Sequence, residues 1–133
     1  MLTSRHPRML RFTLRFIAVV QFVLGAAFLI APERVASLLG LATTPGWANW
    51  MFGMMAARFL AFGYGMLVAA RDPAGNLPWV GSMIVVQLID WGVTFKYLLT
   101  GAVTLAQVSS ASFLPLVFIA LLWWGWPRPS RAA

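Results

Sequence analysis

The sequence contains no cysteine and only one histidine, and 3 of its 133 residues are acidic. Without cysteine the chain can form neither a disulfide nor a thiol redox centre. The lone His6 lies in a basic tail and cannot supply paired haem ligands, and three separated carboxylates cannot build a two-metal site. No glycine-rich phosphate loop or serine–histidine pairing is present either. We therefore expect no catalytic residues, no metal site and no cofactor, and hence no enzyme.

Charge is scarce overall. Charged residues make up 10% of the chain, whereas hydrophobic residues make up 61%. An ordinary soluble domain carries about 25% charged residues, and a soluble core of this length would leave large apolar patches exposed. The apolar residues also form long blocks, which indicates an integral membrane protein.

Four of these blocks are near the roughly 20 residues that a hydrocarbon core of about 30 Å requires. Their approximate bounds are 10–31, 47–70, 77–99 and 103–126. Turn residues separate them, most clearly in the segment Asp72-Pro73-Ala74-Gly75-Asn76. The sequence therefore predicts an all-α fold, a single-domain bundle of four transmembrane helices over residues 1–133. Residues 34–41 are predicted to form either a short interfacial helix or a loop packed on the bundle.

Basic residues outnumber acidic residues by ten to three and gather at the two ends of the chain. Because lysine and arginine favour the cytoplasmic side of a membrane, both termini are expected there, which agrees with an even number of spans. We expect a multi-pass protein of the bacterial inner membrane, surrounded by lipid. Nucleic-acid binding would need a soluble basic face, which the sequence lacks.

A carboxylate lies inside the third block, where the sequence reads VVQLIDWGVTF around Asp90. Counting back equal distances from the turn at 72–76 places Arg58 of the second block at the same depth. Either charge alone costs about 2.5–3.5 kcal/mol at the centre of a membrane helix. An ion pair between Arg58 and Asp90 would offset that cost, and we expect one.

Other polar residues converge on the same depth. Residues 83, 87, 90, 94 and 97 recur at three- and four-residue steps and should share one face of the third helix. One polar residue from each block completes the predicted intramembrane cluster, whose members are Arg58, Asp90, Gln87, Gln21 and Ser112.

Two further features concern how the helices pack. Small residues let helices approach closely, and we expect this at Gly25, Gly63, Gly65 and Gly92. Trp91 lies inside the apolar core beside Asp90. Its indole is expected either to pack against its neighbours or to donate a hydrogen bond.

The polar cluster admits two interpretations. In the first, which we favour at this stage, it holds the helices together in a non-catalytic accessory or assembly subunit. The partner would then be another membrane protein or a further copy of the chain. In the second, it serves a small transporter or lipophilic-ligand-binding protein, with Phe62 and Trp91 as aromatic walls. A large midplane cavity beside Asp90 would favour the second, and a tightly packed bundle the first.

Three segments carry a family resemblance: Arg15-Phe16-Ile17-Ala18, LGAAFLIAPERVASLLGL and AARFLAFGYGMLVAARDP. They resemble small bacterial four-span proteins of the DoxX-like and related uncharacterised families. The resemblance implies an inner-membrane four-helix bundle, and DoxX itself is linked to accessory subunits of membrane redox assemblies. It transfers no catalytic residue to this chain.

Overall fold

The computed structural model describes residues 2–4, 6–41 and 45–129. Within these residues the chain forms five α-helices and one pair of two-residue strands. The helices are α1 (Pro7–Ile30), α2 (Pro32–Leu38), α3 (Gly46–Arg71), α4 (Leu77–Leu99) and α5 (Ser109–Trp124). The strands β1 (Leu2–Thr3) and β2 (Arg128–Pro129) pair antiparallel. The predicted all-α fold is confirmed.

Three of the helices, α1, α3 and α4, are long and apolar enough to cross a membrane. They have 24, 26 and 23 residues and cover the first three predicted blocks. The helix α5 is also apolar but has only 16 residues. The predicted start of the fourth span at residue 103 is therefore wrong, because residues 105–108 form a turn and the helix begins at Ser109.

Side-chain hydrogen bonds hold the turn that precedes α5. The Gln107 Oε1 atom accepts hydrogen bonds from the Thr104 backbone N–H at 2.8 Å and from the Thr104 hydroxyl at 3.1 Å. Gln107 Nε2 donates to the Gly40 carbonyl at 2.9 Å. Together these bonds hold residues 104–107 in a turn that contacts the chain just after α2.

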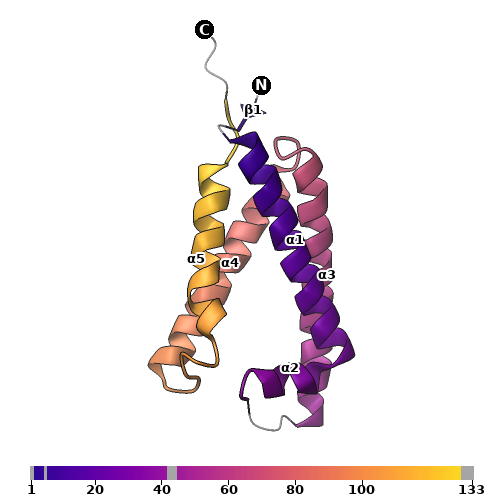
Figure 1. Cartoon of the computed structure of the whole chain (residues 1–133), viewed down its shortest axis with the longest axis vertical. Coiled ribbons are helices and arrows are strands. Elements are labelled where there is room, and N and C mark those ends of the chain that lie inside the picture. Colours follow the sequence, from indigo (N-terminus) through magenta and orange to yellow (C-terminus); the bar gives the residue numbers. More distant parts are fainter. Residues whose placement is uncertain (1, 5, 42–44, 130–133) are drawn as a thin grey trace.

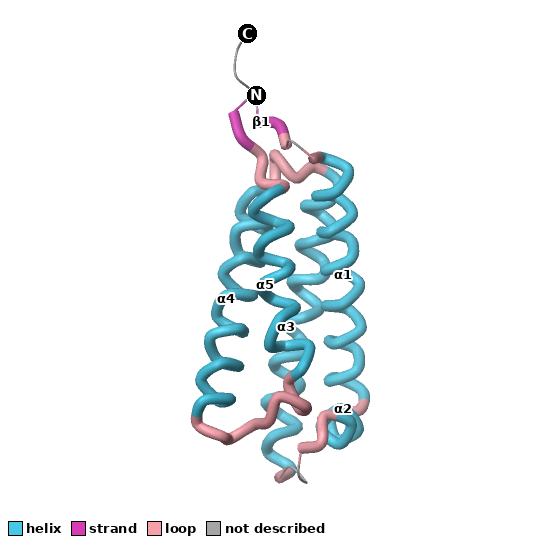
Figure 2. The backbone as a smooth tube through the Cα atoms, turned by 60° about the vertical axis from the view of Figure 1, so that its left-hand side comes forward, coloured by secondary structure: helices cyan, strands magenta, loops and turns pink. Residues whose placement is uncertain are grey.

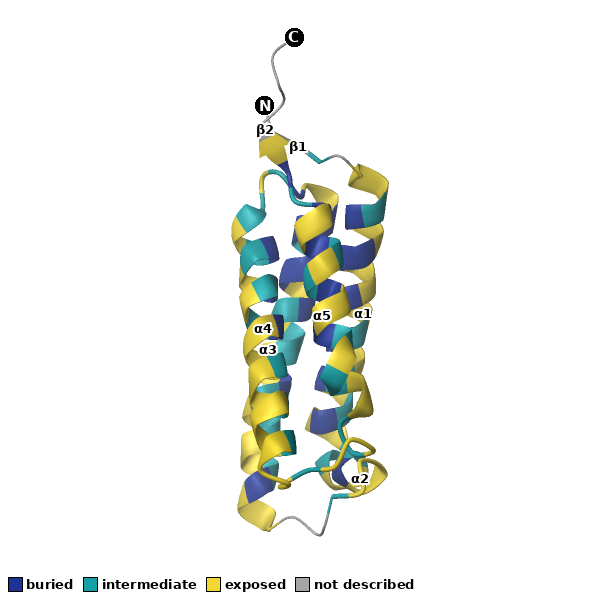
Figure 3. Ribbon diagram, turned by 90° about the vertical axis from the view of Figure 1, so that its left-hand side faces the viewer, coloured by how far each residue is buried: buried dark blue, intermediate teal, exposed yellow. Residues whose placement is uncertain are grey.

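The helices form two pairs, with α1 packed along α3 and α4 packed along α5. Figure 1 shows that the pairs meet at the end that carries both termini and diverge toward the end that carries α2. The main hydrophobic core lies where the pairs meet and includes Leu10, Leu14, Met66 and Leu122. Much of the surface of the helices is exposed, as Figure 3 shows, which is expected of helices that face lipid.

Glycines allow close contact between helices, both between the two pairs and within one pair. The ring of Trp79 in α4 lies directly against Gly65 of α3, so closely that a Cβ atom at Gly65 would clash with it. A Cβ atom at Gly25 of α1 would lie 2.9 Å from the Leu60 side chain of α3. At Gly92, by contrast, a Cβ atom would meet nothing within 4 Å, so the predicted close approach there is wrong.

The two ends of the bundle are tied in different ways. At one end β1 pairs with β2 (Figure 2), and the Ser4 hydroxyl donates a hydrogen bond of 2.7 Å to the Gly125 carbonyl. At the other end α2 packs on α3, and Asn49 Nδ2 donates to Glu33 Oε1 at 2.9 Å. The segment predicted at 34–41 is thus a short helix that contacts the bundle, while its Leu38 stays 87% exposed.

Candidate intramembrane ligand site

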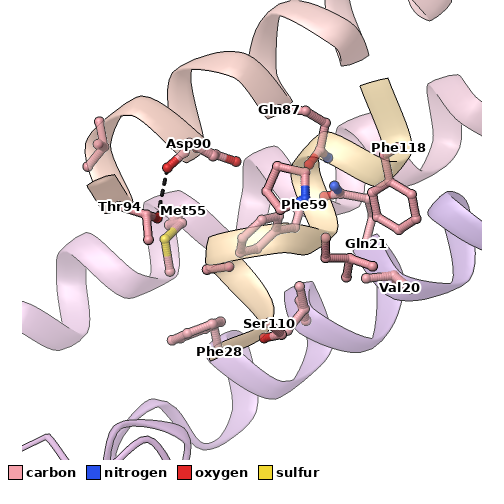
Figure 4. A pocket seen from close by; sticks show the side chains of 15 residues that line it. Val20, Gln21, Phe28, Met55, Phe59, Gln87, Asp90, Thr94, Ser110 and Phe118 are labelled. Atoms are coloured by element: carbon pink, nitrogen blue, oxygen red, sulfur yellow. Dashed lines mark hydrogen bonds between the residues drawn. The ribbon is translucent and has the colours of Figure 1, made fainter. Parts of the chain in front are cut away.

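A cavity of about 330 Å³ lies among α1, α3, α4 and α5. Fifteen residues from all four helices line it, as Figure 4 shows. The polar residues among them are Gln21, Gln87, Asp90, Thr94 and Ser110. The remaining ten are apolar, so the site is a partly open hydrophobic cavity with a few polar groups. Pockets for small ligands commonly have this composition.

Asp90 is the charged residue of the cavity wall. Its backbone carbonyl accepts a hydrogen bond of 2.8 Å from the Thr94 hydroxyl, which belongs to the next turn of α4. Among the described residues, no hydrogen bond or ion pair reaches its carboxylate oxygens. Asp90 lines the cavity as an exposed residue, and its carboxylate keeps its full capacity to accept hydrogen bonds.

The predicted ion pair between Arg58 and Asp90 is absent from the described part of the structure. Arg58 lines a different hollow, which is formed by residues of α3 that include Trp50 and Met54. The reason is the pairing of the helices. Because α3 packs on α1 and α4 packs on α5, the two charges lie on elements that diverge away from their connecting turn (Figure 1).

Two buried amides lie beside Asp90. Gln21 of α1 is 4% exposed and Gln87 of α4 is 6% exposed. Both direct Nε2 toward the Met83 sulfur, at 4.0 Å from Gln21 and 3.3 Å from Gln87. Sulfur is a weak acceptor, so neither contact is strong.

The Oε1 atom of Gln21 is buried and has no hydrogen-bond partner among the described residues. Leaving a buried acceptor unpaired costs about 1–3 kcal/mol, and such atoms are uncommon in folded proteins. Since Gln21 lines the cavity, a ligand seated there could supply the missing donor.

The predicted cluster is thus brought together only in part. Gln21, Gln87 and Asp90 share the cavity, whereas Arg58 and Ser112 do not line it. The Ser112 hydroxyl donates to the Ser109 carbonyl at 2.6 Å, within its own helix.

The hydroxyl that α5 contributes to the cavity comes from Ser110, which the sequence analysis missed. Residues 110, 114 and 118 all line the cavity at four-residue steps. That spacing follows one face of a helix, and it could have identified Ser110.

The aromatic walls also differ from the prediction. Phe28, Phe59 and Phe118 line the cavity, and the first two rings stack with centroids 6.2 Å apart. Phe62 instead packs edge-on against Trp79. Trp91 stacks on Phe95 and lies outside the cavity wall.

Trp91 does make the hydrogen bond that was one of its two predicted roles. Its indole N–H donates to the Ser112 carbonyl at 3.1 Å. This bond joins α4 to α5 next to the cavity, because Asp90 and Ala111, the sequence neighbours of Trp91 and Ser112, line it. It therefore helps to hold the α4–α5 pair together at the level where Asp90 and Ser110 face the cavity.

A scan against models of known families and searches of curated proteins and of solved structures found no match to this chain. The DoxX-like resemblance accordingly stays a prediction that depends on the three segments quoted above.

Proposed function

We propose that the chain crosses the bacterial inner membrane four times, with both termini in the cytoplasm. Three helices of sufficient length and apolarity support this. The helix α5 lies beside α4 along most of its 16 residues, which span about 24 Å. The pairing of β1 with β2 keeps the two ends of the described chain together, as an even number of spans requires.

Cysteine labelling tests this topology. The chain has no cysteine of its own, so a single introduced cysteine reports one position. In spheroplasts, a membrane-impermeant maleimide should label Ala102→Cys, in the loop before α5, without permeabilisation. It should label Arg128→Cys, beyond α5, only after detergent is added. The unmodified chain serves as the blank, and labelling of both positions in intact spheroplasts would show that α5 does not cross.

We further propose that the protein binds a small amphiphilic ligand within the bilayer, as a small transporter or a lipophilic-ligand-binding protein. One observation carries this proposal. The cavity among the four helices holds a carboxylate and a buried amide oxygen that no described protein group satisfies. A cluster that served only to join helices would pair its own polar groups.

The accessory-subunit role stays a prediction from the sequence. A tightly packed bundle would favour that role, whereas the cavity beside Asp90 favours ligand binding. The exposed apolar surface of the helices does not separate the two roles, because lipid and a membrane-protein partner would both cover it.

Filling the cavity should abolish binding. Ala111 lines the cavity, whereas Ala120 lies on the exposed side of the same helix. The neutral fluorescent probe 1-aminoanthracene should bind the purified protein in detergent. Ala111→Phe should weaken that binding about tenfold or more, because the added ring occupies the ligand volume. Ala120→Phe should leave it unchanged.

The measurement is the rise in probe fluorescence on titration with protein, corrected with empty micelles. Equal binding by wild type and Ala111→Phe would place the probe outside the cavity. The absence of saturable binding to the wild type would count against the ligand-binding function altogether.

A further inference from the structure

Resting on this proposed function, we infer that the ligand is a small organic cation with an apolar body, and that it exchanges with a proton at Asp90. The inference concerns the chemical class of the ligand and what its binding releases. Three features of the cavity carry it: its net charge, the kind of polar groups left unpaired, and its aromatic walls.

The charge of the cavity wall is negative. Asp90 comes from α4, and the residues that α1, α3 and α5 contribute include no titratable side chain. The neighbouring cation on α3 is Arg58, which lines a separate hollow, and Met55 lies between because it lines both. On α4 itself, the Lys96 ammonium lies 5.6 Å from the centroid of the Tyr97 ring.

The Asp90 side chain is exposed in the structure, and in the proposed transmembrane position its exposed side would face lipid. A carboxylate there must be neutralised. An isolated ion costs a great deal when it is removed from water, and it is tolerated only when it is paired or protonated. Since no cation from the described residues pairs with Asp90, a proton or a positively charged ligand has to fill that role. An anionic ligand would add repulsion and is disfavoured.

The unpaired groups are acceptors. Gln21 Oε1 lacks a partner, and the carboxylate oxygens of Asp90 accept no hydrogen bond from the described residues. The Nε2 groups of Gln21 and Gln87 are already directed at the Met83 sulfur. A complementary ligand therefore brings positive charge or hydrogen-bond donors.

The walls suit the body of such a ligand. Phe28, Phe59 and Phe118 present phenyl rings to the cavity, and the face of an aromatic ring attracts cations in addition to burying apolar surface. The volume of about 330 Å³ is at the lower end of the range for ligand pockets, which is roughly 300–1,000 Å³. A single-ring ammonium compound fits this description.

A proton and the cationic ligand must compete for Asp90, because the cavity wall holds one carboxylate. In the ligand-free state that exchanges, Asp90 holds a proton and is neutral. When the cation binds, the carboxylic O–H bond breaks, the electron pair stays on Asp90, and the proton leaves to water. The bound pair is then a carboxylate with an ammonium ion, and the total charge is conserved. Cation binding should therefore weaken as the pH falls, because protons compete for the same site.

The experiment displaces 1-aminoanthracene from the full-length protein with three water-soluble compounds of similar size. They are benzyltrimethylammonium (positive), benzyl alcohol (neutral) and benzoate (negative). Benzyltrimethylammonium should displace the probe at a concentration about tenfold or more below that of benzyl alcohol. Benzoate should be the weakest of the three. Calorimetry in buffers of different ionisation enthalpy should find up to about one proton released per cation bound.

Two variants assign the preference to Asp90. Asp90→Asn should remove the preference for the cation over benzyl alcohol and the dependence on pH. The matched control is Glu33→Gln, which removes a carboxylate that lies outside the cavity. If Asp90→Asn does not fold, the pH dependence of the unmodified protein decides the same question.

The outcomes separate the two proposals. Equal displacement by the cation and by benzyl alcohol, with saturable probe binding, would overturn the cation assignment and leave the ligand-binding function standing. A preference for the cation that survives in Asp90→Asn, or that does not change with pH, would also overturn it. A wild-type protein that binds no probe would overturn both proposals.

Discussion

Gly65→Ala should lower the free energy of unfolding by about 1–3 kcal/mol, which is the usual cost of forcing extra atoms into a packed core. The ring of Trp79 occupies the space that a Cβ atom at Gly65 needs. The ring cannot easily turn aside, because Phe62 packs edge-on against it with centroids 6.2 Å apart. Relief would require α3 and α4 to separate where they are in closest contact.

Thermal unfolding in a mild detergent measures this effect, and Gly53→Ala is its control. Gly53 lies in the same helix, but a Cβ atom there would meet nothing within 4 Å. Alanine is also the better helix former, so Gly53→Ala should leave the melting temperature unchanged or raise it. Equal melting of the two variants would show that α4 does not press on α3 at Gly65.

The parts of this fold that could be predicted depend on composition and on helical period. Block length and apolarity predicted α1, α3 and α4 within a few residues of their observed bounds. The three- and four-residue steps in the third block placed Gln87, Asp90 and Thr94 on one face, and all three line the cavity. Such inferences succeed because they concern residues within a single helix.

The errors concern relations between helices. Counting from the turn at 72–76 gives the depth of Arg58, but it does not give the direction of its side chain or the helix on which α3 packs. Because α3 packs mainly on α1, Arg58 is not directed at Asp90. The fourth helix was predicted to begin too early for a different reason. Residues 103–108 are apolar enough for a span, but residues 105–108 form a turn in which Gln107 bonds to the distant Gly40, a contact that no local pattern predicts.

The central claim is that the polar cluster is a ligand site and not a device that joins helices. The two readings require opposite effects when Gln21 is replaced by methionine, which has a similar shape but no amide. In a ligand site the empty protein bears the cost of the unpaired Oε1 atom. Removing that atom should therefore stabilise the protein by about 1–3 kcal/mol. In a joining device the same change would remove a useful bond.

Gln107→Met provides the contrast, because Gln107 uses both ends of its amide. It donates to the Gly40 carbonyl and accepts from the Thr104 N–H and hydroxyl. This variant should melt at a lower temperature than the wild type, since three hydrogen bonds are lost and each contributes about 0.5–1.5 kcal/mol at most sites. Because both variants replace glutamine by methionine, a difference between them reflects the hydrogen bonds at each site and not the substitution itself.

The most direct test is thus the melting temperature of ligand-free Gln21→Met in detergent, compared with the wild type. We expect it to rise while that of Gln107→Met falls. A fall in the melting temperature of Gln21→Met would show that the amide stabilises the bundle, and it would contradict the ligand site proposed for this cavity.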